Sequence, residues 1–269
     1  MGMRSAIVVG ATGLVGSQLV QLLCESKEYM SVTVLTRRQL NYTHDKLVER
    51  IVNFDELVES DLEFADDVFC CLGTTIKKAG TRQQFEKVDI EYPLHIAAMA
   101  KKRGIQHFIV ISAMGANEKS MAYYNQVKGK LEKELMDMDL PQLSIVRPSL
   151  LVGNRQEFRL GEKVGEAALR ALNPLLIGPM KKARAIEASQ VALAMKVIAL
   201  QGKKQKVSIY SSDELMTMHM PVTEERVEIA RERVFNWDKR KNDELAPLDE
   251  EVVFDRDKLK ELEVKKEQE

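Results

Sequence analysis

Tyr124 and Lys128 are a pair whose residue types and spacing suggest proton-transfer chemistry. They stand four positions apart in a segment whose pattern predicts a helix over Ala122–Met136, so their side chains are expected on one helical face. A lysine ammonium beside a phenol lowers the pKa of the phenol, and a tyrosine tuned in this way can exchange a proton with a carbonyl or an alcohol. The neighbouring Tyr123 has no lysine four residues on, and we interpret it as a packing residue.

A glycine-rich turn lies near the N-terminus. The segment Gly10–Gly16 (GATGLVG) follows a predicted strand over Ser5–Val9 and opens a predicted helix, the context in which such a pattern indicates a dinucleotide site. Gly10 allows the tight turn, Gly13 lets the backbone approach a pyrophosphate, and Gly16 lets the helix pack close to the strand. The helix N-terminus offers unpaired N–H groups to phosphates. No lysine follows the loop, which disfavours a nucleoside triphosphate site of the Walker type.

The end of the second predicted strand, Val32–Leu35, bears on the choice of dinucleotide. An NAD site usually carries Asp or Glu there to hold the ribose 2′-hydroxyl, whereas this chain continues Thr36-Arg37-Arg38. A guanidinium can pair with a 2′-phosphate that a carboxylate would repel. The sequence therefore predicts NADP(H) as the cofactor; the alternative is that one of the arginines is merely a solvated strand end.

The elements that must position these residues alternate between strands and helices. Strands are predicted at Ser5–Val9, Val32–Leu35, Glu49–Val52, Val68–Leu72, His107–Ile111, Leu143–Val146 and Lys206–Tyr210, and helices at Leu14–Glu25, Thr81–Arg103, Ala122–Met136 and Ser189–Leu200. The uniformly apolar run VFCCL suits a strand covered on both faces. This alternation predicts an α/β fold, a Rossmann doubly wound parallel sheet with helices on both faces, over residues 1–215.

Residues 216–269 differ in composition from the rest of the chain. They contain 11 Lys/Arg and 16 Asp/Glu, so half of the stretch is charged. Within it, Val227, Ala230, Val234 and Trp237 recur at helical spacing and could dock one helix on the core or on a protein partner. We predict a charged, partly helical C-terminal extension, with a solvated segment as the alternative to a binding module.

The overall composition argues against several classes of partner. The net charge is −1, so neither a basic field nor an acidic excess points to nucleic acid. The four histidines show no metal-ligand spacing, and we expect no metal site. Because the chain shows no signal-length apolar stretch and no spanning segment, we expect a cytoplasmic protein without a membrane partner.

The three cysteines are Cys24, Cys70 and Cys71. Two of them are adjacent within an apolar run, which favours buried thiols in a reducing compartment over a disulfide framework. A reactive redox pair is the alternative.

Several further short motifs occur along the chain. They are FCCLGTT at Phe69–Thr75, KAG at Lys78–Gly80, Val88-Asp89, QVKG at Gln126–Gly129, Arg147-Pro148 and RQE at Arg155–Glu157. With the glycine loop and the Tyr124–Lys128 pair, they make the chain resemble the atypical short-chain dehydrogenases/reductases from about Ala6 to Ser212. More narrowly, it resembles the Tat-interacting-protein oxidoreductases and their bacterial relatives.

The resemblance implies that Tyr124 is the catalytic acid/base and that Lys128 holds the nicotinamide ribose and tunes the phenol. The other implied cofactor contacts are to the pyrophosphate by Thr12, Gly13, Leu14 and Val15, to the 2′-phosphate by Arg37 and Arg38, to the ribose and nicotinamide by Gly73, Thr74 and Leu151, and from a substrate-side loop by Arg159.

One position departs from the resembled pattern. Many short-chain reductases place a Ser or Thr after the fifth strand to hold the substrate oxygen, and similar chains often carry two serines where this one has Ser112-Ala113. Ser112 is therefore a candidate catalytic residue, with a strand-end serine satisfied by the backbone as the alternative. If the second position is the working one, the missing hydroxyl could cost on the order of 100-fold in rate.

Two functions follow from these residues as expectations. The first is an enzyme, an NADP(H)-dependent oxidoreductase that transfers a hydride between nicotinamide and a small carbonyl or alcohol, with a substrate pocket formed mainly by Val152–Pro179. The second is an NADP(H)-binding, redox-sensing regulatory protein with little or no turnover; Ala113 favours it slightly, while Tyr124 and Lys128 argue against it. A protein kinase is not supported, because the chain has no His-Arg-Asp or Asp-Phe-Gly motif.

Oligomeric state is a separate expectation. The helix that carries Tyr124 and the Asn173–Pro179 loop could pack against a second copy of the chain, as in a homo-oligomer.

Overall fold

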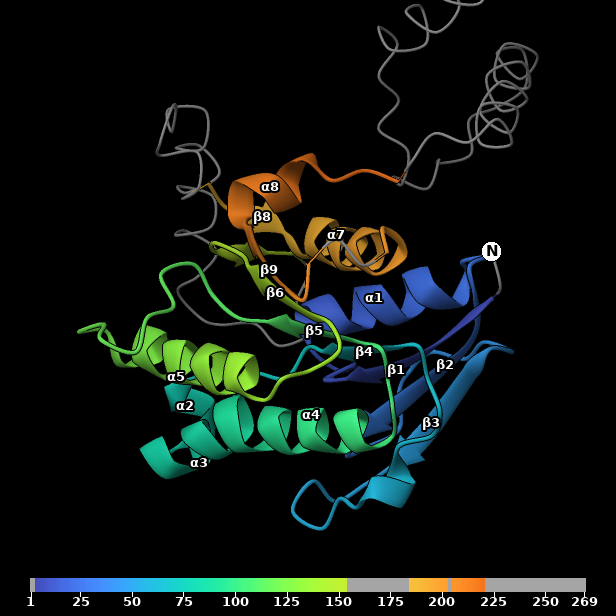
Figure 1. The fold of residues 1–269 in the computed structure, drawn as a ribbon, viewed down its shortest axis with the longest axis horizontal. Coiled ribbons are helices and arrows are strands. Elements are labelled where there is room, and N and C mark those ends of the chain that lie inside the picture. The colour runs from blue at the N-terminus through green and yellow to red at the C-terminus, as the bar shows by residue number, and fades with distance from the viewer. Residues whose placement is uncertain (1–2, 154–183, 203–204, 221–269) are drawn as a thin grey trace, which may run out of the picture. The chain divides into compact units, whose positions relative to one another are not determined.

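A seven-stranded parallel sheet is the framework of the protein (Figure 1). The computed structural model describes residues 3–153, 184–202 and 205–220. In spatial order the strands are β3 (Leu47–Ile51), β2 (Tyr29–Thr36), β1 (Arg4–Val9), β4 (Asp67–Cys70), β5 (His107–Ile111), β6 (Leu143–Arg147) and β9 (Val207–Ser211). A separate two-stranded parallel sheet pairs β7 (Leu151–Val152) with β8 (Ile186–Glu187).

Helices cover both faces of the large sheet, as Figure 1 shows. One face carries α1 (Leu14–Cys24) and α7 (Ala188–Leu200), which pack against each other, and the other carries α4 (Tyr92–Lys102) and α5 (Tyr123–Asp137). The short elements are α2 (Ile76–Ala79), α3 (Arg82–Glu86), α8 (Ser212–Thr217), the 3₁₀ turn η1 (Glu59–Asp61) and the π-helical turn η2 (Lys87–Glu91). The predicted doubly wound Rossmann architecture is confirmed.

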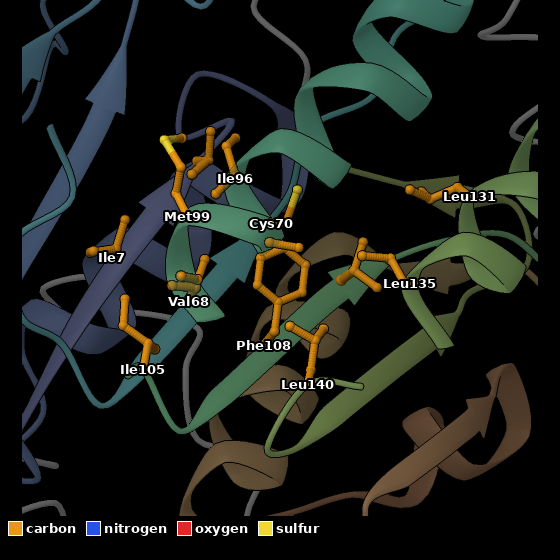
Figure 2. Packing of buried hydrophobic residues seen from close by; sticks show 14 of the residues in the cluster. Ile7, Val68, Cys70, Ile96, Met99, Ile105, Phe108, Leu131, Leu135 and Leu140 are labelled. Carbon is orange, nitrogen blue, oxygen red and sulfur yellow. The ribbon is translucent and has the colours of Figure 1, made fainter. Parts of the chain in front are cut away.

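Two apolar clusters lie on opposite sides of the sheet. Along β4, Val68 and Cys70 belong to the cluster beneath α4 and α5, while Phe69 between them belongs to the cluster beneath α1 and α7. Figure 2 shows the first cluster, in which Phe108 of β5 and Met99 of α4 pack with these side chains. Every residue of β4 is buried, which explains the apolar residues Val68–Cys70, whereas Cys71 and Leu72 lie beyond the strand and are half-buried.

The long helix predicted over Thr81–Arg103 is wrong as a single element. It is divided into α3, the π-helical turn η2 and α4, and Pro93 stands in the first turn of α4. A proline has no N–H to donate, so the regular helical ladder fails at this point and a wider turn takes its place. The helix does end as predicted at Gly104, whose φ is +71°.

The last described element is α8. Its Leu215 is fully buried, and Gln190 of α7 donates hydrogen bonds to the carbonyl oxygens of Leu215 and Met218. Residues 221–269 lie outside the described residues, so the extension predicted from residue 216 and its boundary stay predictions.

Candidate cofactor and catalytic site

The candidate site lies at the carboxyl ends of the central strands. The chain moves outward in one direction from β1 to β2 and β3, and in the other from β4 to β5 and β6. The loops that follow β1 and β4 therefore leave the sheet side by side at a change of direction, which is where open α/β sheets bind their ligands. The first of these loops is Gly10–Gly16, and the second contains Gly73 and Thr74.

The glycine loop is packed as the sequence predicts. Gly10 has a φ of +86°, and a Cβ there would lie 2.5 Å from the carbonyl oxygen of Cys71. A Cβ at Gly16 would overlap the carbonyl oxygen of Gly10, so α1 begins in direct contact with the loop. Both positions consequently require glycine, one for its backbone conformation and both for space.

The N-terminus of α1 is open to a ligand. Gly13 is its N-cap and supplies no side-chain cap, and the first turn holds no acidic residue. Thr12 and Gly13 are exposed and Leu14 is half-buried, which is compatible with the predicted pyrophosphate contacts. Val15 differs, because its side chain is buried in the cluster beneath α1 and α7, so only its backbone is left to face a phosphate.

Arg37 and Arg38 are both exposed just beyond β2. The turn that presents them is held by Thr36, whose hydroxyl donates to the carbonyl oxygen of Arg38 at 2.8 Å. Tyr92 lies close enough to Arg37 for the arginine charge to act on its pKa, and its hydroxyl donates to Asp55 at 2.6 Å, so a carboxylate is present in the same region. Asp55 is also paired with Lys87 at 2.7 Å, and these two partners lower its pKa. The carboxylate of Asp55 is therefore already paired with the ammonium of Lys87.

Tyr124 and Lys128 share one face of α5 but differ in exposure. Tyr124 is 39% exposed, whereas Lys128 is 2% exposed, and its Nζ lies 2.8 Å from Oδ1 of Asp89. Burial acts to lower the pKa of Lys128, but the carboxylate of Asp89 and the nearby Tyr124 oxygen raise it, and the net pKa is raised. The ammonium is therefore charged at neutral pH. An exposed phenol next to a buried ammonium is compatible with the acid/base chemistry expected of Tyr124.

Tyr123 is a packing residue, as predicted. Its hydroxyl donates to Oε1 of Glu86 at 3.0 Å, its ring lies 5.9 Å from that of Phe85, and the guanidinium of Arg82 lies over it at 4.8 Å. These contacts join α5 to α3 and leave its neighbour Tyr124 at the surface.

Asp89 is a site residue whose role the sequence analysis missed. It is fully buried on η2, and its Oδ2 accepts the backbone N–H of Thr74 at 2.8 Å. A Cβ at Gly73 would lie 3.5 Å from Oδ1 of Asp89 and 3.8 Å from Nζ of Lys128, so the ion pair lies directly under the loop after β4. The signal in the sequence was an aspartate inside an apolar helical pattern, next to Val88. It pointed to no partner, because Thr74 and Lys128 are 15 and 39 residues away.

Ser112 follows β5 at the edge of the site, but its hydroxyl is enclosed. The residue is 2% exposed, and within the described part of the chain its Oγ is buried without a hydrogen-bond partner. Only its backbone is engaged, through an N–H that donates to Val146. In this conformation the hydroxyl of Ser112 is closed off from solvent, and it is not a backbone-satisfied hydroxyl either. Ala113, which is also buried, offers no replacement.

Leu151 is placed near the glycine loop by β7. A Cβ at Gly153, two residues on, would lie 3.3 Å from Cδ1 of Leu14, so this short strand approaches the start of α1. Leu151 is half-buried, compatible with its expected place beside the cofactor. Arg159 and nearly all of the substrate pocket expected over Val152–Pro179 lie outside the described residues.

The cysteines are free thiols, as expected. Burial raises the pKa of Cys24 and Cys70 to about 11, and it raises the pKa of Cys71 well above its ordinary value. Such thiols are poor nucleophiles at neutral pH, which argues against a reactive pair. Across the described residues there is no group of three or more His, Cys, Asp or Glu side chains arranged to hold a metal ion.

Residues 10–168 match the family model described as NAD(P)H-binding. The chain belongs to this family, and within it to the atypical short-chain dehydrogenases/reductases. It is 36% identical to Protein HTATIP2 of Rattus norvegicus over 164 residues, which cover 59% of this chain and 67% of that protein. It is 31% identical to "Protein FMP52, mitochondrial" of Candida albicans over 223 residues, covering 80% and 97%.

Solved structures share the fold at low sequence identity. One is a UDP-N-acetylglucosamine 4-epimerase from Methanobrevibacter ruminantium in complex with UDP-N-acetylmuramic acid, at a TM-score of 0.59 and 18% identity, covering 97% of this chain and 96% of that one. Another is MoeE5 in complex with UDP-glucose and NAD, at a TM-score of 0.59 and 16% identity, covering 78% and 79%.

The expected cytoplasmic localisation is contradicted by the relatives. Those from Debaryomyces hansenii, Candida albicans and Eremothecium gossypii are all named mitochondrial. The expectation rested on the lack of a signal-length apolar stretch, which does not distinguish the cytoplasm from the interior of an organelle. Among the described helices, none is both long enough and apolar enough to cross a bilayer.

Proposed function

We propose that this protein is an NADP(H)-dependent oxidoreductase that interconverts a small carbonyl compound and the corresponding alcohol. The observation that carries the proposal is the exposed phenol of Tyr124 beside the buried, charged Lys128, under the loop that follows β4. The open N-terminus of α1, in the neighbouring loop after β1 at the same edge of the sheet, fits the pyrophosphate of a dinucleotide.

We assign a separate role to each residue of the site. The dinucleotide supplies or accepts the hydride. Tyr124 donates its phenolic proton to the carbonyl oxygen during reduction and takes it back during oxidation. Lys128, held beneath Gly73, orients the nicotinamide ribose and places a positive charge beside the phenol. Arg37 and Arg38 pair with a 2′-phosphate, which is the basis for proposing NADP(H) over NAD(H).

The proposal is tested by titrating the protein with NADPH and NADH and then supplying aldehydes, ketones and quinones. Tight binding of NADPH with consumption of any acceptor is the expected result. Tyr124→Phe should abolish turnover and leave NADPH affinity nearly unchanged, because only the proton donor is removed. Tyr123→Phe is the matched control, since it removes a hydroxyl that bonds Glu86 outside the site. Equal turnover in Tyr124→Phe and the unmodified chain would exclude the assigned role.

A second candidate function is an NADP(H)-binding regulatory protein with little turnover. The observation in its favour is that neither Ser112 nor Ala113 presents a hydroxyl to a substrate. It predicts tight NADPH binding without consumption of any acceptor. In that case Ala113→Ser is the variant to test for a gain of turnover, and the absence of NADPH binding would exclude both functions.

A further inference from the structure

The buried carboxylate of Asp89 joins three segments that are distant in the chain. Oδ1 lies 2.8 Å from Nζ of Lys128 on α5, an ion-pair contact without hydrogen-bond geometry, and Oδ2 accepts the N–H of Thr74 after β4 at 2.8 Å, while Asp89 itself belongs to η2. Asp89 and Lys128 are both almost fully buried. A π-helical turn adds one residue to a helix and turns side chains to new directions, and such turns are frequent at functional sites.

We propose that Asp89 is a positioning residue of this site, whose two oxygens fix the ammonium of Lys128 and the Gly73–Thr74 loop relative to each other. The inference rests on the proposed function for the role of Lys128 and extends it to a residue that touches neither cofactor nor substrate. In this arrangement the ammonium of Lys128 is held beneath the Gly73–Thr74 loop, with its Nζ 3.8 Å from the place that a Cβ would occupy at Gly73.

The surroundings of Lys128 explain why a carboxylate is needed. Burial alone drives a lysine towards its neutral form, and buried lysines lose several units of pKa when unpaired. The groups that face Lys128 are Asp89 from η2, Tyr124 from α5 and the thiol of Cys70 from β4, and of these Asp89 is the strongest in raising the pKa of Lys128. Without the carboxylate, the pKa of the ammonium would fall and its anchor would be lost.

The test compares Asp89→Asn with Glu132→Gln. Glu132 is also buried on α5, one turn beyond Lys128, and pairs with Arg147 outside the site, so each variant neutralises one buried carboxylate of an ion pair. The readout is the NMR signal of the Lys128 side chain in protein labelled at lysine, assigned by its absence in Lys128→Met. In Asp89→Asn we expect this signal to titrate at a pH lower by roughly one unit or more, and in Glu132→Gln at the pH of the unmodified chain. An unchanged titration in Asp89→Asn, or an equal shift in both variants, would overturn the proposal.

The same variants are compared by turnover. In Asp89→Asn, Lys128 should lose its proton at a lower pH than in the unmodified chain. The decrease of kcat/KM at alkaline pH should therefore begin at a lower pH in this variant and not in Glu132→Gln. If Asp89 acts through Lys128, adding Asp89→Asn to Lys128→Met should change NADPH affinity less than two-fold, and a further loss would show a separate structural role. The double variant leaves no unpaired buried charge, so it remains measurable where Asp89→Asn does not fold.

The outcomes separate this inference from the proposed function. The NMR titration needs neither cofactor nor turnover. If the protein binds no NADPH, the proposed function fails while the link between Asp89 and Lys128 is still measured; if Asp89→Asn oxidises NADPH at the normal rate at every pH, the positioning role fails alone.

Discussion

Tyr124, Lys128 and Ser112 were grouped by sequence as catalytic candidates, yet they lie in three different environments. The phenol of Tyr124 is at the surface, the ammonium of Lys128 is buried against a carboxylate, and the hydroxyl of Ser112 is enclosed with no partner in the described part of the chain. Only the first can touch a substrate. The ammonium of Lys128 lies beneath the loop that contains Gly73 and Thr74. The hydroxyl of Ser112 must rotate or be uncovered before it can contribute to catalysis.

The arginines after β2 give the first prediction at the residue scale. Replacing Arg37 and Arg38 together by Ala should weaken NADPH binding by roughly 1–3 kcal/mol and leave NADH binding nearly unchanged, because only NADPH carries the 2′-phosphate that the guanidinium groups are proposed to pair with. Titration calorimetry with both nucleotides measures this. Arg103→Ala, exposed at the far end of α4, is the control that should change neither affinity. A preserved preference for NADPH would contradict the assignment.

Placements that depend on local spacing were predictable, and those that depend on distant contacts were not. Gly16 packs against Gly10 within one loop, and Tyr124 and Lys128 lie within one turn of a helix, so sequence spacing carries the information. The role of Asp89 depends on contacts with Thr74 and Lys128, and the burial of Ser112 depends on how neighbouring elements pack. Neither leaves a local pattern.

At the scale of elements, α5 is anchored along its length by groups on successive turns. Lys128 pairs with Asp89, and Glu132, one turn on, receives two hydrogen bonds from the guanidinium of Arg147 at 2.9 and 2.5 Å. Between them, Gly129 lies against the backbone of Asn117 and Glu118 in the loop that returns from β5. The position of Tyr124 is therefore set by packing of the whole helix.

Gly129→Ala tests this anchoring. A Cβ at this position would overlap the peptide that joins Asn117 to Glu118, so either the loop or the helix must move. We expect a loss of roughly 1–3 kcal/mol in the free energy of unfolding, measured by chemical denaturation, together with weaker NADPH binding because Lys128 is adjacent. Lys130→Ala, exposed on the same helix, should stay within about 0.5 kcal/mol of the unmodified chain. Equal stability of the two variants would show that the close contact is not needed.

Strands and helix ends were predictable to within a few residues, since buried parallel strands are apolar runs and glycine ends helices. The break within Thr81–Arg103 was not anticipated. Pro93 stands in the first turn of α4, where proline is tolerated, and it was the local signal in the sequence that a new helix begins there.

At the scale of the whole molecule, a polar network crosses the amino ends of the sheet, opposite the candidate site. Arg4 and Tyr29 donate to the buried carboxylate of Asp67 at 2.6–2.7 Å, and the ring of His107 shares a hydrogen bond of 2.8 Å with Ser144. Nδ1 of His107 lies 3.7 Å from Oδ1 of Asp67. The five residues come from β1, β2, β4, β5 and β6, so the network links five adjacent strands.

His107 makes the stability of the protein depend on pH. Burial, helped by the charge of Arg4, lowers its pKa from 6.5 to about 4. Between these values the unfolded chain binds a proton that the folded chain does not, so the free energy of unfolding should fall as pH decreases from 6.5 to 4. The contribution of this one group is about 3 kcal/mol. Denaturation of the unmodified chain and of His107→Gln at several pH values isolates it, because the variant should lack this part of the loss. Parallel pH dependences would contradict the prediction.

The π-helical turn has a consequence for how this molecule tolerates change. Each residue of an α-helix advances the side chain by about 100°, so a wide turn resets the phase between the segments on either side of it. Deleting one residue between Asp89 and Pro93 would restore regular pitch and swing the carboxylate of residue 89 away from Thr74 and Lys128, although no residue of the site would have been replaced. The site is therefore encoded in the length of this segment as well as in its residues, and within it an insertion or deletion is a more severe change than most substitutions.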